Sequence, residues 1–398
     1  MKTWILLVLL LTISGTALAE ALKSHVGNFY PFLKAYAGRS EFALSFLSRD
    51  WPDPDTWRAQ GRAKMRELLA YEAAPAPRDA EILATVKEPG YTRHHVRYSV
   101  TADRKTEAFL LVPAGLKGRA PAVVAIHDHG GFYYFGKEKI TKTDIRSAPL
   151  SGHIRSAYGG RTYADELARR GFVVLVPDGF YFGSQRLDPG TVPDKAAGRL
   201  LKLEPDSDDY VRAFNRFASK HEEVVAKTLF TSGTTWPGVL FQGDRASVDY
   251  LLTRPEVDGE RIGCIGLSIG GFRSAHLFGL DGRVKVGVVA GWMTTYASLL
   301  LDHLHFHTWM IYVPGQHAWL DLPDVATLNA PHPLMVINCS RDILFTMEGM
   351  KAAEAKIAKV YGKLGAGGRF TCNYYDEPHS LKIPAQDDAI AWLERWLK

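Results

Sequence analysis

Residues 266–271 read Gly-Leu-Ser-Ile-Gly-Gly and restrict the fold more than any other part of the chain. The mostly apolar residues 261–265 before them predict a strand, and the small-residue run 271–277 after them predicts a helix. A serine with glycines two positions away on both sides, in that setting, is typical of a nucleophile elbow. The motif therefore predicts that a sharp turn lifts the Ser268 hydroxyl clear of the backbone at the start of a helix. The alternative is a structural glycine-rich turn.

The overall composition is that of a globular protein, with 46% hydrophobic and 23% charged residues among 398. The formal net charge of +5 is spread along the chain. Short basic runs such as Lys137-Glu138-Lys139 are interrupted by acids and are interpreted as solvated surface. These runs do not form a continuous basic stripe that could follow a phosphate backbone, so the composition does not predict nucleic-acid binding.

Residues 1–19 have the pattern of an export signal. Lys2 supplies a positive start, residues 5–13 are apolar, and Ala17-Leu18-Ala19 forms a small-x-small cleavage site. The apolar core is too short to span a bilayer comfortably, and no cysteine stands at the cleavage point. We therefore expect cleavage near Ala19, a periplasmic or extracellular location and no membrane span.

The three cysteines, Cys264, Cys339 and Cys372, are an odd number and all fall in apolar, strand-like runs. We expect buried free thiols. A bridge between Cys339 and Cys372 on neighbouring strands is the alternative, although their offsets from the strand ends differ.

Residues 20–80 are expected to form an N-terminal helical extension packed on the main domain. Residues 41–47 and 57–71 carry apolar side chains at three-to-four spacing, and the proline-rich residues 75–77 end the segment.

Residues 81–398 alternate strand and helix patterns and are expected to form the catalytic domain. Such alternation predicts an α/β fold with a mostly parallel central sheet flanked by helices, and a site at the carboxyl ends of the strands. The first two strands are expected to form a hairpin. The predicted strands are 91–100, 107–112, 122–127, 172–177, 261–265, 284–290, 333–339 and 369–375, and the predicted helices are 160–170, 244–253, 349–364 and 385–397.

Two long connections, residues 183–241 and 292–331, begin at this edge of the sheet. Long loops in a compact domain are usually functional or disordered. Both are rich in aromatic residues, so we interpret them as walls of a substrate pocket. The candidate wall residues are Trp292, Trp309, Tyr312 and Trp319.

A serine nucleophile needs a histidine base that a carboxylate holds in one tautomer. Asp342 follows the predicted strand 333–339, and His379 follows the strand 369–375. Ser268, Asp342 and His379 thus occur in the order serine, acid, histidine. Asp376 and Glu377 are the rival carboxylates, although their closeness to His379 in sequence makes a productive approach to its ring difficult.

A developing oxyanion needs two backbone N–H donors. The amide of Ile269 is one candidate, because it follows the serine at a helix N-terminus. The second is the amide of His129, with Gly130 as the alternative, in the glycine-containing loop 126–132. A connector with no catalytic part is the competing interpretation of that loop.

His303, His305 and His307 alternate and would share one face of a strand, which suggests a metal site. No carboxylate cluster accompanies them, and the predicted triad needs no metal. We therefore favour a role in the pocket wall and expect no metal or cofactor.

Several segments together resemble the α/β-hydrolase superfamily, and more narrowly the secreted bacterial esterases of the acetyl xylan esterase-like and dienelactone hydrolase-like type. The resemblance covers roughly residues 40 to 398 and implies the α/β-hydrolase fold with Ser268, Asp342 and His379 as the triad. It rests on Asp244-Arg245, Tyr250-Leu251, Arg254 to Asp258, Arg261 to Gly263, Gly266 to Gly271, Gly291 to Thr295, His307 to Met310, Val313 to Gly315 and Asp321 to Ala326.

Two departures from the related patterns matter. True dienelactone hydrolases use a cysteine nucleophile, whereas this elbow carries Ser268, and Cys264 lies inside the predicted strand. Glucuronoyl esterases resemble the layout but carry an arginine directly after the serine, where this chain has Ile269.

The sequence thus predicts a secreted serine hydrolase of carboxylic esters, with acetyl or other small acyl esters on carbohydrates as substrates. Two enzyme alternatives are a glucuronoyl-type methylesterase and a peptidase of the prolyl-oligopeptidase type. The peptidase normally carries a repeat-built propeller, and no repeats precede the predicted sheet. A binding protein that has kept the fold without catalysis is the third alternative.

Overall fold

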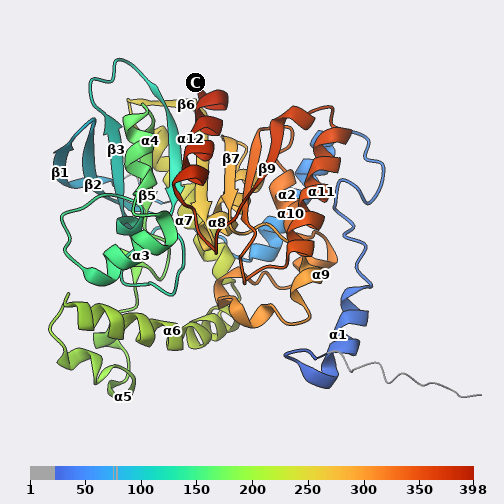
Figure 1. Ribbon diagram of the computed structural model, residues 1–398, viewed down its shortest axis with the longest axis horizontal. Helices are drawn as coiled ribbons and strands as arrows, with labels where there is room; N and C mark the ends of the chain where they lie inside the picture. The colour runs from blue at the N-terminus through green and yellow to red at the C-terminus, as the bar shows by residue number, and fades with distance from the viewer. Residues whose placement is uncertain (1–22, 75, 78) are drawn as a thin grey trace, which may run out of the picture.

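One sheet organises the fold (Figure 1). The computed structural model describes residues 23–74, 76–77 and 79–398, and the strands within them lie in the order β1-β2-β3-β5-β4-β6-β7-β8-β9. The expected export signal, residues 1–19, lies outside the described residues. The strands are β1 (Glu81–Glu88), β2 (Tyr91–Ser99), β3 (Lys105–Pro113), β4 (Ala120–Ile126), β5 (Val173–Pro177), β6 (Val257–Leu267), β7 (Val284–Ala290), β8 (Leu334–Cys339) and β9 (Phe370–Tyr375).

The sheet is antiparallel at one edge and parallel over the rest. β1, β2 and β3 pair antiparallel in sequence order, and β3 pairs antiparallel with β5. From β5 across to β9, every neighbouring pair is parallel. The predicted α/β class, the mostly parallel sheet and the hairpin of β2 and β3 are therefore confirmed. Strand β1 was missed, because its side chains are exposed along almost its whole length and show no buried alternation.

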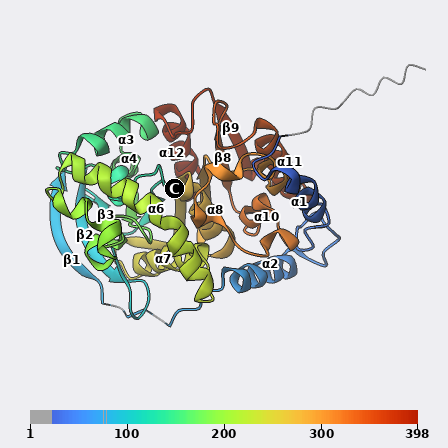
Figure 2. The same cartoon turned by 90° about the horizontal axis from the view of Figure 1, so that it is seen from below.

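Helices cover both faces of the sheet because its central strands are apolar on both sides. All residues of β4, β5 and β8 are buried, as parallel strands require. Helices α4 and α12 pack on one face, and α7 and α8 pack on the other (Figure 2). Six of the helices after β4 are α3 (Ala148–Tyr158), α4 (Tyr163–Arg169), α7 (Trp236–Leu252), α8 (Ile269–Leu280), α11 (Met347–Lys363) and α12 (Ile383–Leu397), and the others lie in the two long connections.

The N-terminal segment contributes α1 (Tyr30–Ala37) and α2 (Pro54–Leu69). Asp53 caps α2, since its carboxylate accepts a bond from the Thr56 amide at 2.8 Å. The helix packs on the main domain through buried apolar residues, and Arg62 donates to the Gly279 carbonyl at 2.8 Å.

The helix predicted over residues 41–47 is wrong. This segment forms turns, and Phe42 has a φ of +46°, which no helix contains. Leu44 and Phe46 are buried, and the Trp57 indole donates to the Leu44 carbonyl at 3.0 Å. The helix-like spacing of the apolar residues reflects their insertion into the core from successive turns.

The connection 183–241 is largely helical and not the long loop that we predicted. It contains α5 (Asp194–Ala197) and the 24-residue α6 (Asp208–Thr231), and α7 begins at Trp236 instead of residue 244. The second connection contains α9 (Tyr296–Leu299), several 3-10 turns and α10 (Leu322–Thr327). Figure 1 shows α6 and α9 together at the end of the sheet where the parallel strands finish.

The three cysteines are free thiols, two of them buried and Cys372 half-buried. In the register of β8 and β9, Cys339 faces Tyr375 and Cys372 faces Val336. The two sulfurs are therefore offset by three positions. No helix in the described part of the chain combines the length and the apolar character that a bilayer crossing needs.

Candidate active site

Ser268 stands at the turn between β6 and α8, with φ +62° and ψ −121°. Non-glycine residues adopt this conformation only under strain. A Cβ on Gly266 would lie 2.4 Å from the backbone oxygen of Gly270, and a Cβ on Gly270 would lie 2.5 Å from the Ile126 carbonyl. The turn thus excludes larger residues at both positions, and it has the strand–turn–helix geometry of a nucleophile elbow.

Asp342 and His379 meet because they follow parallel neighbouring strands. Asp342 lies after β8 and His379 after β9, so their loops emerge at the same edge. Nδ1 of His379 lies 2.6 Å from Oδ2 of Asp342, whose side chain is almost fully buried. The Leu344 amide donates to the other carboxylate oxygen at 2.9 Å. This arrangement fixes the plane of the imidazole ring.

The two rival carboxylates point elsewhere. Asp376 pairs with the Arg341 guanidinium at 3.0 Å, and its side chain is 85% exposed. Glu377 lies 3.9 Å from the same guanidinium. Among the three candidates, the carboxylate bonded to His379 is Asp342.

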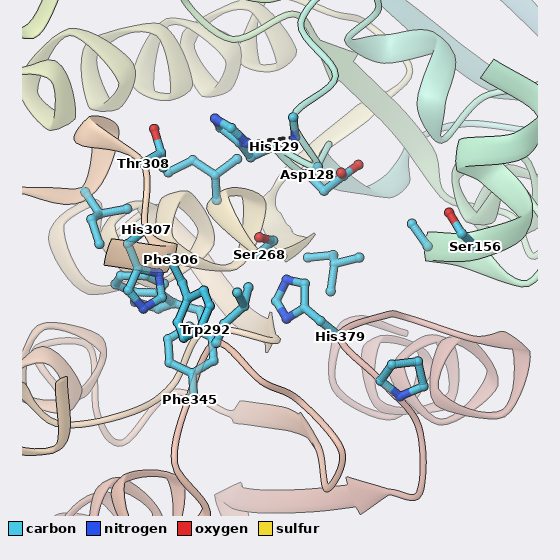
Figure 3. A pocket seen from close by; sticks show the side chains of 18 of the residues that line it. Asp128, His129, Ser156, Ser268, Trp292, Phe306, His307, Thr308, Phe345 and His379 are labelled. Atoms are coloured by element: carbon cyan, nitrogen blue, oxygen red, sulfur yellow. Dashed lines mark hydrogen bonds between the residues drawn. The ribbon is translucent and has the colours of Figure 1, made fainter. Parts of the chain in front are cut away.

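A cavity of about 500 Å³ connects these residues. Ser268 and His379 both line it, and their side chains lie next to each other inside it (Figure 3). Nε2 of His379 has no hydrogen-bond partner among the described residues. That nitrogen is the atom through which a general base would act on the serine.

The two sides of the cavity differ in polarity. Trp292, Phe306 and Phe345 lie on one side of Ser268, and Asp128 and Ser156 lie on the other (Figure 3). No lysine or arginine is among the described residues that line the cavity. The site therefore offers an aromatic surface and a hydroxyl- and carboxylate-bearing surface, without a cation for an anionic ligand.

Of the four aromatic residues predicted for the pocket wall, Trp292 lines the cavity and is buried. The other three lie outside its lining. Trp319 covers the ammonium of Lys64 in α2, 4.5 Å from its ring centre. Trp309 is 40% exposed, and Tyr312 is half-buried against the core.

The three alternating histidines do not lie on a strand. His303 precedes the 3-10 turn η6 (Leu304–Phe306), His305 belongs to it and His307 follows it, so the alternation of a strand does not apply to them. Only His307 of the three lines the cavity, where burial lowers the pKa of its imidazole to about 4. Within the described residues, no group of three or more histidine, cysteine or acidic side chains could hold a metal.

The predicted oxyanion donors border the cavity. Ile269 begins α8, whose N-terminus adds positive potential, and His129 and Gly130 lie in the loop after β4. Gly130 and Gly131 have φ of +55° and +63°. In the hydrogen bonds of the described residues, the amides of His129 and Gly130 donate to no acceptor. Neither amide is thus occupied by another group of the described residues.

Glu222 of α6 was not predicted from the sequence. It connects the loop 126–132, which carries the candidate oxyanion donors and is called the oxyanion loop below, to the second long connection, residues 292–331. Its carboxylate contacts Nε2 of His129 at 2.7 Å and the Tyr133 hydroxyl at 2.6 Å. Its second oxygen accepts from the Thr308 hydroxyl at 2.8 Å and the Trp309 amide at 3.3 Å. Burial alone would raise the pKa of Glu222, but the bonds from His129, Tyr133 and Thr308 outweigh it and lower the pKa.

The charged run 137–139, predicted to be solvated surface, is buried. Lys137 bonds to Asp178 at 2.8 Å and to Glu138 at 2.9 Å. Lys139 has no exposed surface at all. A charged triplet looks the same in a sequence whether it is solvated or paired inside, so the pattern carried no signal of this burial.

Known proteins resemble this chain in sequence and in fold. A family model described as the dienelactone hydrolase family matches residues 157–360, just over half of the chain. The protein YtaP of Bacillus subtilis (strain 168), provisionally assigned as a hydrolase, is 24% identical over 342 residues. That match covers 85% of this chain and 100% of YtaP.

Solved structures share the fold at low sequence identity. A crystal structure from Bacteroides fragilis NCTC 9343, provisionally assigned as an acetyl xylan esterase, superposes with a TM-score of 0.65 and 15% identity. The match covers 88% of this chain and 84% of that one. A glucuronoyl esterase from Solibacter usitatus superposes with a TM-score of 0.57 and 14% sequence identity, and this match covers 90% of this chain and 97% of the other. At these identities the likeness shows the fold.

Proposed function

Because this chain belongs to the dienelactone hydrolase family, we propose that it hydrolyses carboxylic esters through an acyl-enzyme formed on Ser268. The observation that carries the proposal is the arrangement of Ser268 and His379 in one cavity, with Asp342 bonded to the far nitrogen of the ring. A serine–histidine–aspartate triad requires its three residues to meet at one edge of the sheet in this way.

The nucleophile in this proposal is a serine and not the cysteine of true dienelactone hydrolases. Cys264 lies inside β6 with no exposed surface, and burial raises the pKa of its thiol far above the range of a reactive thiolate. Ser268 is the residue that occupies the elbow and borders the cavity.

In the acylation step, the Ser268 oxygen attacks the ester carbonyl while Nε2 of His379 takes the hydroxyl proton. The Asp342 carboxylate accepts a hydrogen bond from the Nδ1–H group, which holds the useful tautomer and stabilises the imidazolium. The carbonyl oxygen becomes an oxyanion, which the amides of Ile269 and of His129 or Gly130 stabilise. The intermediate then collapses, the carbon–oxygen bond to the alcohol breaks, and His379 returns the proton to the departing alcohol oxygen.

In the deacylation step, water attacks the acyl group on Ser268. His379 takes one proton from that water, and the same amides stabilise the second oxyanion. Collapse breaks the bond between the acyl carbon and the Ser268 oxygen, which regains its proton from His379. The products are a carboxylic acid, an alcohol and the regenerated enzyme, and no cofactor enters the cycle.

We propose that the substrate is a neutral small acyl ester, such as an acetyl ester, on a carbohydrate. The polar side of the cavity, with Asp128 and Ser156, suits the hydroxyl groups of a sugar, and the aromatic side suits apolar packing or stacking on a ring. The absence of a lysine or arginine from the described lining disfavours a substrate that carries a free carboxylate.

Two alternative enzymes are less well supported. A glucuronoyl-type methylesterase shares the fold, but Ile269 stands where the resemblance to that group calls for an arginine. A peptidase of the prolyl-oligopeptidase type would carry a propeller domain. The described residues before β1 instead form α1, α2 and turns.

We also propose the division of the chain into an export signal (1–19), a helical extension (20–80) and a catalytic domain (81–398), with export to the periplasm or beyond. The support is the sequence pattern of the first residues and the packing of α2 on α8. Intact mass and N-terminal sequencing of the protein recovered outside the cytoplasm test this. A mature chain that begins after Ala19 is expected, and a chain that retains Met1 contradicts it.

A substrate panel tests the proposed activity. We expect turnover of 4-nitrophenyl acetate and acetylated xylo-oligosaccharides, with kcat/KM at least ~100-fold above that for the methyl ester of glucuronic acid, in which the sugar lies on the acyl side of the ester bond instead of the alcohol side. The Ser268→Ala variant should lose activity on every ester. Equal or better turnover of the uronate ester contradicts the assigned substrate class, and full activity of the variant contradicts the mechanism.

A further inference from the structure

Lys139 is a fully buried lysine whose ammonium binds backbone instead of a carboxylate. Its Nζ donates to the Asp128 carbonyl at 2.7 Å and to the His129 carbonyl at 3.2 Å. It also lies 4.8 Å from the ring centre of Phe182. Among the ion pairs of the described residues it takes part in none. A buried charge is costly unless it is compensated, so this use of a lysine calls for a function.

The peptide bond couples these carbonyls to the candidate oxyanion donors. The Asp128 carbonyl and the His129 N–H belong to one planar unit, as do the His129 carbonyl and the Gly130 N–H. In a trans peptide, the C=O and the N–H point in opposite directions. A cation that binds both carbonyls from one side therefore turns both N–H groups toward the other side. Residues 129 and 130 line the catalytic cavity, and their amides have no acceptor among the described residues.

We propose that Lys139 is a positioning residue of the oxyanion hole, whose ammonium orients and polarises the peptides that present the His129 and Gly130 amides to the substrate. The inference rests on the proposed ester hydrolysis at Ser268. Positive charge at the oxygen end of each peptide draws electron density away from its N–H, so each amide becomes a stronger donor to a developing oxyanion.

The path of the loop does not depend on Lys139 alone. The Asp128 carbonyl also lies 2.9 Å from Nδ1 of His127, and the His129 carbonyl accepts from the Phe132 amide at 2.9 Å. What Lys139 alone adds is a full charge on the carbonyl side of both peptides. A neutral replacement of similar length should therefore fold and lose transition-state stabilisation selectively.

Lys137 offers a matched control within the same turn. It is also buried and cationic, but its ammonium pairs with Asp178 and Glu138 and contacts no carbonyl of the oxyanion loop. A comparison of Lys139→Met with Lys137→Met thus separates the loss of a buried charge from the loss of the charge behind the oxyanion loop.

The test measures kcat and KM on 4-nitrophenyl acetate, per active site labelled by a fluorophosphonate. For Lys139→Met we expect kcat to fall by ~100-fold, the size of effect seen when an oxyanion donor is lost, with KM changed by less than ~3-fold. Binding of trifluoroacetone, which forms a tetrahedral adduct with an active serine, should weaken in parallel with kcat. Lys137→Met should lower the melting temperature while its kcat per labelled site stays within ~3-fold of the wild type.

Two results would overturn the inference. One is a Lys139→Met protein with wild-type kcat and wild-type affinity for trifluoroacetone. The other is an equal loss of kcat in the Lys137 variant. If Lys139→Met is not recovered folded, Lys139→Gln, which keeps an N–H donor without the charge, is measured with the same readouts and criteria. Failure of the proposed function is distinguishable, because Ser268→Ala would then retain ester turnover.

Discussion

The carboxylate of Glu222 lies 2.7 Å from Nε2 of His129 and thereby connects the long helix α6 to the loop that borders the cavity of Ser268. The same carboxylate holds Thr308 and Trp309, which belong to the second long connection. One buried side chain thus joins the two connections that follow β5 and β7 to the oxyanion loop. The two connections, residues 183–241 and 292–331, are therefore bonded to the loop that borders the cavity.

Glu222→Gln should lower both activity and stability. A glutamine offers one acceptor oxygen and places N–H donors against groups that are themselves donors, so several buried bonds are lost. We expect a loss of ~2 kcal/mol in unfolding free energy and a fall in kcat/KM of ~10-fold or more. Denaturant unfolding and ester kinetics measure the two effects. Glu223→Gln is the control, because Glu223 is exposed and, among the described residues, forms an ion pair with Lys227 alone. Equal behaviour of the two variants would argue against the role of Glu222.

Asp342→Asn should disable the base without removing the fold. Asparagine can leave the imidazole in the wrong tautomer, which in serine hydrolases costs roughly 10³ to 10⁴ in kcat. The comparison variant is Asp376→Asn, which alters an exposed carboxylate directly after β9 and should stay within ~2-fold of the wild type. A large loss in the Asp376 variant, with an active Asp342 variant, would reassign the acid.

Gly270→Ala should damage the elbow. Its Cβ would lie 2.5 Å from the Ile126 carbonyl and 2.8 Å from the His127 carbonyl, so the backbone has to move. We expect a loss of ~2 kcal/mol or more in stability together with most of the activity. Gly243→Ala in α7 meets nothing within 4 Å and should gain up to ~1 kcal/mol from helix propensity. Thermal unfolding of both proteins checks the contrast, and a neutral Gly270→Ala would refute the tight turn.

The surroundings of Lys139 make a pH prediction possible. Burial lowers the pKa of its ammonium to about 8, from an ordinary value of 10.5, against the opposing charges of nearby carboxylates. The folded protein therefore releases this proton at lower pH than the unfolded chain does. The charged and titratable groups that face Lys139 are Asp128, Asp178, Glu138, Arg273 and His127.

Between about pH 8 and 10.5 the unfolded chain binds more protons at Lys139, so this group's contribution to stability rises with pH. The catalytic contribution moves in the opposite direction, because the charge behind the oxyanion loop disappears. We expect kcat to fall by ~3- to 10-fold as pH rises through about 8, without a drop in melting temperature from this group. Lys139→Met should lack that fall. A wild-type kcat that stays flat, or an identical fall in both proteins, contradicts the prediction.

The sequence predicted those parts of the fold that depend on local pattern. The strand before Ser268, the order of Ser268, Asp342 and His379, and the alternation of the central strands all follow from periodicity and motif spacing. Helix α6 could also have been predicted, since Ser207 caps a run with apolar residues at helical spacing and Asp208 and Asp209 in its first turn.

Other features had no local signature. The burial of Lys139 and Glu222 depends on partners 10 and 93 residues away in the oxyanion loop, and charge alone does not reveal whether a side chain is solvated. The turns around Leu44 imitate helical spacing because apolar side chains enter the core from successive turns. Trp319 was predicted to line the pocket because it is an aromatic residue in a connection at this edge of the sheet. It packs on Lys64 instead.

The most direct test of the central claim is the intact mass of the protein quenched during turnover of an acetyl ester, followed by peptide mapping. The account predicts a species heavier by one acetyl group, with the label on the peptide that contains Ser268, and its absence from Ser268→Ala. It also predicts that the acetylated protein accumulates in a variant whose deacylation is slowed, such as His379→Ala treated with an activated ester. Acetyl label on another residue, or full turnover by Ser268→Ala without any covalent species, would contradict it.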